Sequence, residues 1–101
     1  MAIQLFTFVM DYKGGTYISQ EHAASLKAAV LTWVKKIDVK KIGATKTVVK
    51  KAPFYWDEGK PVPIDGTEGV WCFDLRIGRP LAIVHVIHTT EGVQVRRGKV
   101  R

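Results

Sequence analysis

Residues 3–18 read IQLFTFVMDYKGGTYI and carry the strongest folding signal in the chain. The first eight of them are rich in aromatic and β-branched side chains, with apolar residues at both odd and even positions, which predicts an inner strand buried on both faces. Gly14 and Gly15 can supply the positive φ that a tight turn needs, and extended character resumes at residues 16–18. The stretch therefore predicts a β-hairpin whose second strand is short.

An amphipathic helix is predicted directly after this hairpin. Ser19 is a suitable N-cap, and Glu21 and His22 would then lie in the first turn, where an acid complements the helix dipole. Apolar residues follow at spacings of three and four, and they are Ala23, Leu26, Val30, Trp33, Val34 and Ile37. This stripe is expected to lie on the sheet, while the opposite face, which includes Ser25, meets water.

The second half of the chain predicts another hairpin. Residues 70–77 and 81–89 are extended and apolar and are joined by a Gly-Arg-Pro turn. Residues 53–69, with three prolines and three glycines, are expected to form a long ordered loop that embedded aromatic side chains pin to the domain. Residues 39–52 give conflicting helix and strand signals, of which we favour a short helix, and residues 92–95 are a candidate edge strand.

These elements predict one α+β domain over residues 1–95 with a basic C-terminal tail at 96–101. Its sheet is antiparallel and built from two β-hairpins, with about four strands and a candidate fifth edge strand. One main amphipathic helix packs on one face, and a second short helix is a candidate. A length of 101 residues, 47% of them hydrophobic and 25% charged, is typical of one packed domain.

No membrane or secretion signal is predicted. No apolar run approaches the roughly 18 to 20 residues needed to cross a bilayer, and the N-terminus does not have the pattern of a signal peptide. The single cysteine, Cys72, fits a reducing compartment. We therefore expect a cytoplasmic protein without a membrane partner.

Metal and catalytic sites are not indicated by the pattern. His85 and His88 are three residues apart on a predicted strand and should point to opposite faces, and His22 has no second ligand at helical spacing. Cys72 lies between two aromatic residues and is expected to behave as a small buried hydrophobe. We expect no catalytic residue, no metal and no cofactor, and hence no enzyme.

An enzyme remains a third hypothesis. It would use the acids of residues 57–68 together with Tyr55 or His85. It predicts a pocket where that acidic segment meets the second hairpin.

Residues 11–19, DYKGGTYIS, followed by an amphipathic helix that ends near Trp33, resemble the hairpin and helix of HicB-type antitoxins. The sequence lacks the proline- and glycine-containing strand that such proteins place between the Gly-Gly-Tyr turn and the helix. Its second half has no counterpart in them. We therefore assign no family.

The net charge of +7 is unevenly distributed along the chain. Residues 27–51 hold eight lysines and one acid, whereas residues 57–74 hold five acids and one lysine. The last six residues add four basic side chains. This asymmetry predicts a dipolar surface that attracts phosphate-rich partners or an acidic protein surface.

The function that these patterns favour is polyanion binding, with RNA or DNA as the ligand and without strong sequence readout. The candidate residues form a lysine-rich helical region and a basic C-terminal arm, and they are Lys27, Lys35, Lys36, Lys40, Lys41, Lys46, Lys50, Lys51, Arg96, Arg97, Lys99 and Arg101. Four aromatic residues are expected at the surface, where bases could stack on them, and they are Tyr12, Tyr17, Tyr55 and Trp56. The alternative is a protein–protein interaction module or homodimer that uses an exposed sheet face or edge.

Overall fold

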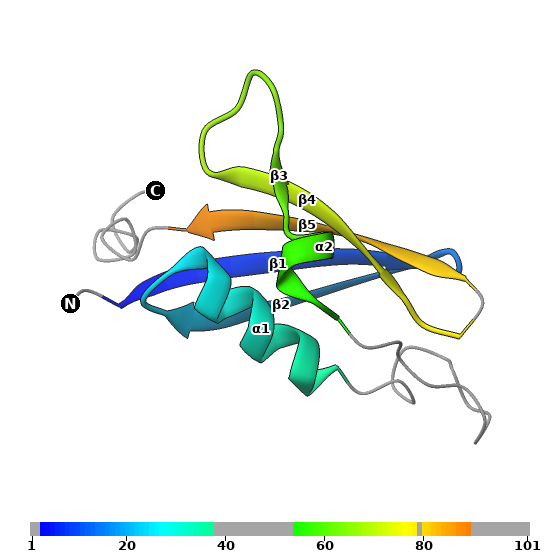
Figure 1. Cartoon of the computed structure of the whole chain (residues 1–101). Coiled ribbons are helices and arrows are strands. Elements are labelled where there is room, and N and C mark those ends of the chain that lie inside the picture. The colour runs from blue at the N-terminus through cyan, green and yellow to red at the C-terminus, as the bar shows by residue number, and fades with distance from the viewer. Residues whose placement is uncertain (1–2, 38–53, 79, 90–101) are drawn as a thin grey trace, which may run out of the picture.

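The computed structural model describes residues 3–37, 54–78 and 80–89, which form a five-stranded antiparallel sheet and two helices. The strands are β1 (Gln4–Tyr12), β2 (Gly15–Ala23), β3 (Val62–Pro63), β4 (Val70–Arg76) and β5 (Leu81–Thr89), and the helices are α1 (Leu26–Lys36) and α2 (Trp56–Gly59). The strand order is β2-β1-β5-β4-β3, so the two hairpins meet where β1 pairs with β5 (Figure 1). The predicted α+β class, with an antiparallel sheet and one main helix, is confirmed.

The fifth strand and the short helix arise in a segment that was predicted to be a loop. Both α2 and β3 lie within residues 53–69. Gly66 and Gly69 have φ values of 83° and 72°, which only glycine adopts easily, and they turn the chain back so that β3 can pair with β4. The helix predicted at 39–52 and the edge strand predicted at 92–95 lie outside the described residues.

The first hairpin turns one residue earlier than its two glycines suggest. Tyr12 pairs with Gly15, and the two residues between them, Lys13 and Gly14, have φ values of 48° and 82°. Two consecutive positive φ angles are the mark of the type I′ hairpin turn. Strand β2 then follows β1 for nine residues, so the prediction of a short second strand is wrong.

Helix α1 begins later than predicted. Ser19 pairs with Phe8 in the sheet, and the N-cap is instead Ser25, whose Oγ accepts a hydrogen bond of 3.1 Å from the backbone N–H of Ala28. Both serines are good local caps. The long β1 strand decides between them, because its backbone groups need partners as far as Gln4.

Replacing Ser25 with alanine is expected to lower the free energy of unfolding by about 1 kcal/mol, since the helix loses the acceptor for one of its unpaired N–H groups. Urea unfolding followed by circular dichroism measures this loss. Ser25→Asp keeps an acceptor oxygen and should restore most of the stability. Equal midpoints for wild type and Ser25→Ala would show that this cap contributes nothing.

The hydrophobic core lies between the sheet and the helices. The even-numbered side chains of β1 face the helices and are buried, and they are Phe6, Phe8, Met10 and Tyr12. The odd-numbered side chains point to the other side, where Leu5 is buried, Thr7 and Val9 are half-buried and Asp11 is exposed. Strand β1 is therefore an inner strand, as predicted, but only one of its faces packs against a described helix.

Four aromatic rings connect the layers of the core. Phe8 stacks on Trp33 of α1 with ring centres 4.7 Å apart and planes 5° from parallel. The Trp33 ring meets Phe73 of β4 edge-on at 6.0 Å, and Phe54 packs against Phe73 at 5.5 Å. Phe54 thereby holds the segment that leads into α2 against the sheet, as predicted for the aromatic residues of that segment.

Tyr12 joins the two hairpins. Its hydroxyl donates a hydrogen bond of 3.2 Å to the backbone oxygen of Ile77, beyond the end of β4. The side chain is buried, so the prediction that Tyr12 lies at the surface is wrong. Of the other aromatic residues expected there, Tyr55 is exposed, while Tyr17 and Trp56 are half-buried.

Candidate functional site

Three of the candidate nucleic-acid-binding residues lie in the described part of the chain, all on α1. Lys35 and Lys36 are exposed in its last turn. Lys27 lies near its start, with Nζ 5.6 Å from the centre of the Trp56 ring. The other candidates fall outside the described residues, and they are Lys40, Lys41, Lys46, Lys50, Lys51, Arg96, Arg97, Lys99 and Arg101.

The lysines of α1 do not form one row. A helix turns by about 100° per residue, so Lys27 and Lys36 lie on opposite sides of its axis. Their contacts agree with this, because Lys27 reaches Trp56 of α2 whereas Lys36 reaches Glu21 of β2. The described part of the predicted lysine-rich face is therefore divided between the two flanks of α1.

Glu21 anchors the end of α1 to the sheet. Its carboxylate oxygens lie 3.1 and 3.2 Å from Lys36 Nζ. Glu21 and His22 belong to β2, so their predicted place in the first turn of the helix is wrong. The Lys36 side chain is 65% exposed while that of Glu21 is 10% exposed, and solvent screening limits such a pair to about 1 kcal/mol or less.

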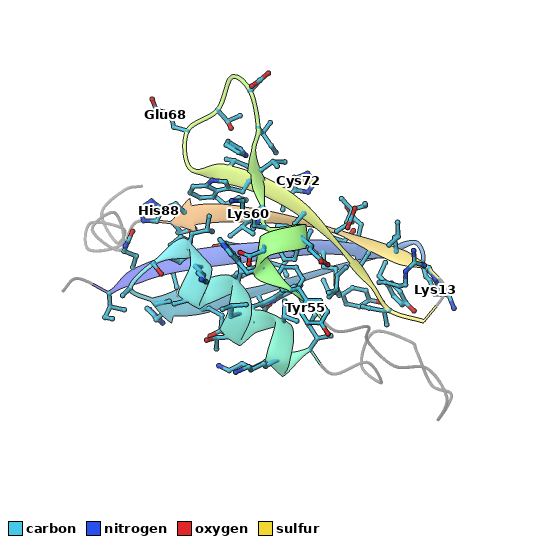
Figure 2. The ribbon with its side chains drawn as sticks, viewed as in Figure 1. Lys13, Tyr55, Lys60, Glu68, Cys72 and His88 are labelled. Atoms are coloured by element: carbon cyan, nitrogen blue, oxygen red, sulfur yellow. The ribbon has the colours of Figure 1, made fainter. Side chains whose placement is uncertain are left out.

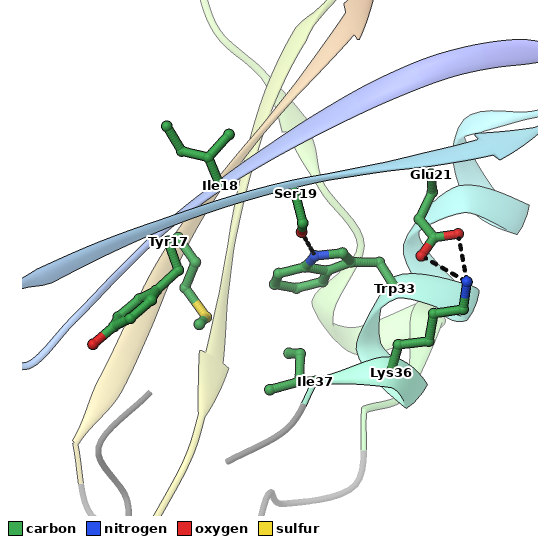
Figure 3. A pocket seen from close by; sticks show the side chains of 8 residues that line it. Tyr17, Ile18, Ser19, Glu21, Trp33, Lys36 and Ile37 are labelled. Atoms are coloured by element: carbon green, nitrogen blue, oxygen red, sulfur yellow. Dashed lines mark hydrogen bonds and ion pairs between the residues drawn. The ribbon is translucent and has the colours of Figure 1, made fainter. Parts of the chain in front are cut away.

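A hollow of about 260 Å³ lies between β2 and the end of α1 (Figure 3). At its wall, Trp33 Nε1 donates a hydrogen bond of 2.9 Å to Ser19 Oγ, and the ion pair of Glu21 and Lys36 stands at one side. Both polar pairs are satisfied within the protein, which leaves mainly apolar surface in the hollow. It borders Ile37, after which the chain passes outside the described residues.

The pocket that an enzyme using the acidic segment would need is present in shallow form. A hollow of about 290 Å³ beside β4 has Glu58, Lys60 and Asp74 in its wall. A neighbouring hollow of about 270 Å³ adds Tyr55. His85 lines neither hollow, although its cross-strand partner Cys72 lines the first. Across residues 3–37, 54–78 and 80–89, no three His, Cys, Asp or Glu side chains gather in a group that could hold a metal ion.

The charge of the described residues is nearly balanced. They carry six basic and seven acidic side chains, whereas residues 38–53, 79 and 90–101 carry ten basic and two acidic ones. The whole excess of positive charge therefore belongs to the stretches that come after α1 and β5, together with Arg79. Sequence patterning located the excess in residues 27–51 and in the tail, but it could not separate the lysines of α1 from those of residues 38–53.

We call the sheet face that points away from the helices the open face. Its central row crosses all five strands in register and consists of Ile18, Val9, His85, Cys72 and Val62 (Cys72 is labelled in Figure 2). Ile83 and Ile87 of β5 stand on either side of this row. Ile18, Val62 and Ile83 are 67%, 59% and 40% exposed. Val62 and Ile83 border the hollow beside β4, whose wall also includes Glu58 and Gly59 of α2.

The neighbouring rows of the open face are more polar. Thr7 Oγ1 accepts a hydrogen bond of 2.9 Å from Gln20 Nε2 and lies 2.7 Å from Thr89 Oγ1. Thr16 Oγ1 donates one of 2.7 Å to Asp11 Oδ1. No Phe, Tyr or Trp of the described strands belongs to this face, because their rings fall at positions that face the helices.

Sequence reasoning placed His85 and His88 on opposite faces, and the structure confirms this. His88 pairs with Phe6 and stacks on its ring, with centres 5.1 Å apart, while His85 pairs with Val9 on the open face. Sequence reasoning missed the cross-strand pairing of His85 with Cys72. The short turn between β4 and β5 was the signal that could have given this register.

Comparison of the chain with protein-family models, with curated proteins and with solved structures found no match. In the described part of the chain, neither helix is long and apolar enough to span a membrane. A functional assignment therefore rests on the chain's own residues and geometry.

Proposed function

We propose that the chain binds a nucleic acid, RNA or DNA, through the basic residues that come after α1 and β5. The observation that carries this proposal is the division of charge. The described fold is close to neutral, while the two stretches and Arg79 hold ten basic side chains and two acids. Positive charge concentrated in this way attracts a phosphate backbone and releases its counterions.

The end of α1 extends this basic surface. Lys35 and Lys36 are exposed in the last turn, immediately before residues 38–53. Lys36 pairs with the buried carboxylate of Glu21, whereas the structure records no ion pair between Lys35 and a described residue, so Lys35 is the lysine of this turn that we expect to contact phosphate. Lys27 lies on the other side of the helix and belongs to the margin of the proposed surface.

Binding is expected to follow the phosphate backbone and not the bases. Single strands are usually read by aromatic rings on an open sheet surface. The described open face has Ile, Val and Thr side chains where such rings would stand. Contacts to phosphate then supply the affinity, and they carry no sequence information.

The test is fluorescence anisotropy with labelled 20-nucleotide single strands of unrelated sequence, titrated at several salt concentrations. If five phosphates are neutralised, the affinity should fall about 100-fold between 50 and 200 mM salt. All sequences should bind with similar affinity. Absence of binding at 50 mM salt, or salt-independent binding of one sequence alone, would contradict the proposal.

A further inference from the structure

We propose that a second copy of this chain covers the open face, so that two sheets pack face to face in a two-fold symmetric dimer. This inference does not rest on the proposed function. It starts from the central row and its neighbours Ile83 and Ile87, in which apolar side chains and Cys72 surround His85. Ile18, Val62 and Ile83 are exposed, and Val9, Cys72 and Ile87 are half-buried. Exposed apolar surface of this extent is uncommon on a monomer.

The area of the open face is sufficient for a weak but specific dimer. Strands β1, β2 and β5 have nine residues each, β4 has seven and β3 has two, and each residue covers about 3.3 Å by 4.8 Å of the sheet. The face therefore covers about 550 Å², and two copies would bury about 1,100 Å². Specific interfaces begin at about this size. Aligned sheets in β-sandwiches pack in the same manner, about 10 Å apart.

Five polar side chains of the open face have hydrogen-bond partners within one copy. Gln20, Thr7 and Thr89 hydrogen-bond to one another, and Thr16 bonds to Asp11. Because these groups already have partners within one copy, a second copy can cover them at lower cost than unpaired polar groups. The interface would then have an apolar centre and a polar rim.

The acids determine the direction of the two-fold axis. Asp11 and Asp74 stand on either side of Ile83 in one row. An axis parallel to β5 would place Asp11 opposite Asp74 of the second copy, and would do so twice, which like-charge repulsion disfavours. An axis that runs across the strands along the central row avoids this contact.

The axis along the central row gives a favourable set of contacts. The row on its other side contains Gln20, Thr7, Ile87 and Val70. Asp11 then lies opposite Thr7 of the second copy, and Ile83 lies opposite Ile87. Asp74 lies opposite Val70, at the edge of the sheet where β3 no longer pairs with β4. Cys72 belongs to the central row itself, so it faces Cys72 of the second copy.

The first test is the mass of the protein in solution, measured by light scattering at about 100 µM. We expect twice the chain mass of 11.3 kDa. The double variant Ile83→Lys, Ile87→Lys should have the mass of one chain and an unchanged circular dichroism spectrum. The matched control is the double variant Ala28→Lys, Thr32→Lys, which adds the same two charges at exposed positions of α1 and should remain a dimer.

The second test uses the only thiol of the chain, Cys72. A bismaleimide with a spacer of about 8 Å adds one thiol at each end and should join two chains, because sheets about 10 Å apart bring the two sulfurs within reach. With the axis parallel to β5, the sulfurs would lie about 14 Å apart and remain unlinked. A wild-type monomer at about 500 µM, or a lysine double variant that stays dimeric, would overturn the proposal, and a dimer without cross-linking would overturn the axis.

Discussion

Replacing Phe8 with alanine is expected to lower the free energy of unfolding by about 3 to 5 kcal/mol. Phe8 is fully buried at the centre of β1. Its ring stacks on Trp33, which in turn touches Phe73, so removal of the ring opens a cavity where the sheet, α1 and β4 meet. Domains of this size are stable by only about 5 to 15 kcal/mol, so this one change removes a large share of the total.

Urea unfolding followed by circular dichroism and by tryptophan fluorescence measures this effect. The fluorescence is informative because Trp33 lies directly on the Phe8 ring. Tyr55→Ala is the matched control, since Tyr55 is 61% exposed and its removal should change stability by no more than about 0.5 kcal/mol. Similar losses in both variants would show that the aromatic contacts of Phe8 do not form the centre of the core.

Local signals in the sequence predicted the turns and the inner strands well, because such signals act over a few residues. The hairpin near Gly14 follows from backbone sterics, and the aromatic and β-branched side chains of β1 indicated an inner strand. The prediction that β1 is buried on both faces did not anticipate that Asp11 is exposed. The helix start was misjudged, because Ser19 and Ser25 are equally good caps. Only the pairing of β2 with the whole of β1 decides between them, and this pairing is not a local property.

Long-range contacts explain why the predicted positions of Tyr12 and Glu21 were wrong. Tyr12 was expected at the surface, yet it is buried and its hydroxyl donates a hydrogen bond to Ile77 in the other hairpin. Glu21 was assigned to a helix, where its charge would suit the dipole, but it pairs with Lys36 across the gap between β2 and α1. Neither partner can be identified until it is known that β1 lies beside β5.

The two candidate surfaces also differ in how far the sequence predicts them: the basic residues can be seen in the sequence, and the open face cannot. The clustering of basic residues is a property of composition, so it is visible in the sequence and places the excess charge near Lys40, Lys41 and the tail. The open face is a property of strand order and register. The row from Ile18 to Val62 joins residues from five strands, and no pattern within one strand indicates it.

The second large effect is expected from reversing charge in the stretch after α1. In the double variant Lys40→Glu, Lys41→Glu, the affinity for a single-stranded oligonucleotide at 50 mM salt should fall about 50-fold or more, since each lost phosphate contact removes about a factor of eight at this salt. The slope of log affinity against log salt should also become shallower by about one to two units. Circular dichroism should show an unchanged fold.

The control for this variant is Lys13→Glu, Lys60→Glu, which lowers the net charge by the same amount at two exposed positions of the described fold. The proposed binding through the basic stretches is tested most directly by measuring the affinity of wild type and of these two variants for the same oligonucleotide at 50 mM salt. We predict that the Lys40, Lys41 variant loses most of its binding and that the Lys13, Lys60 variant stays close to wild type. Equal losses in the two variants would contradict the account, because binding would then depend on net charge alone and not on the basic stretches that flank the fold.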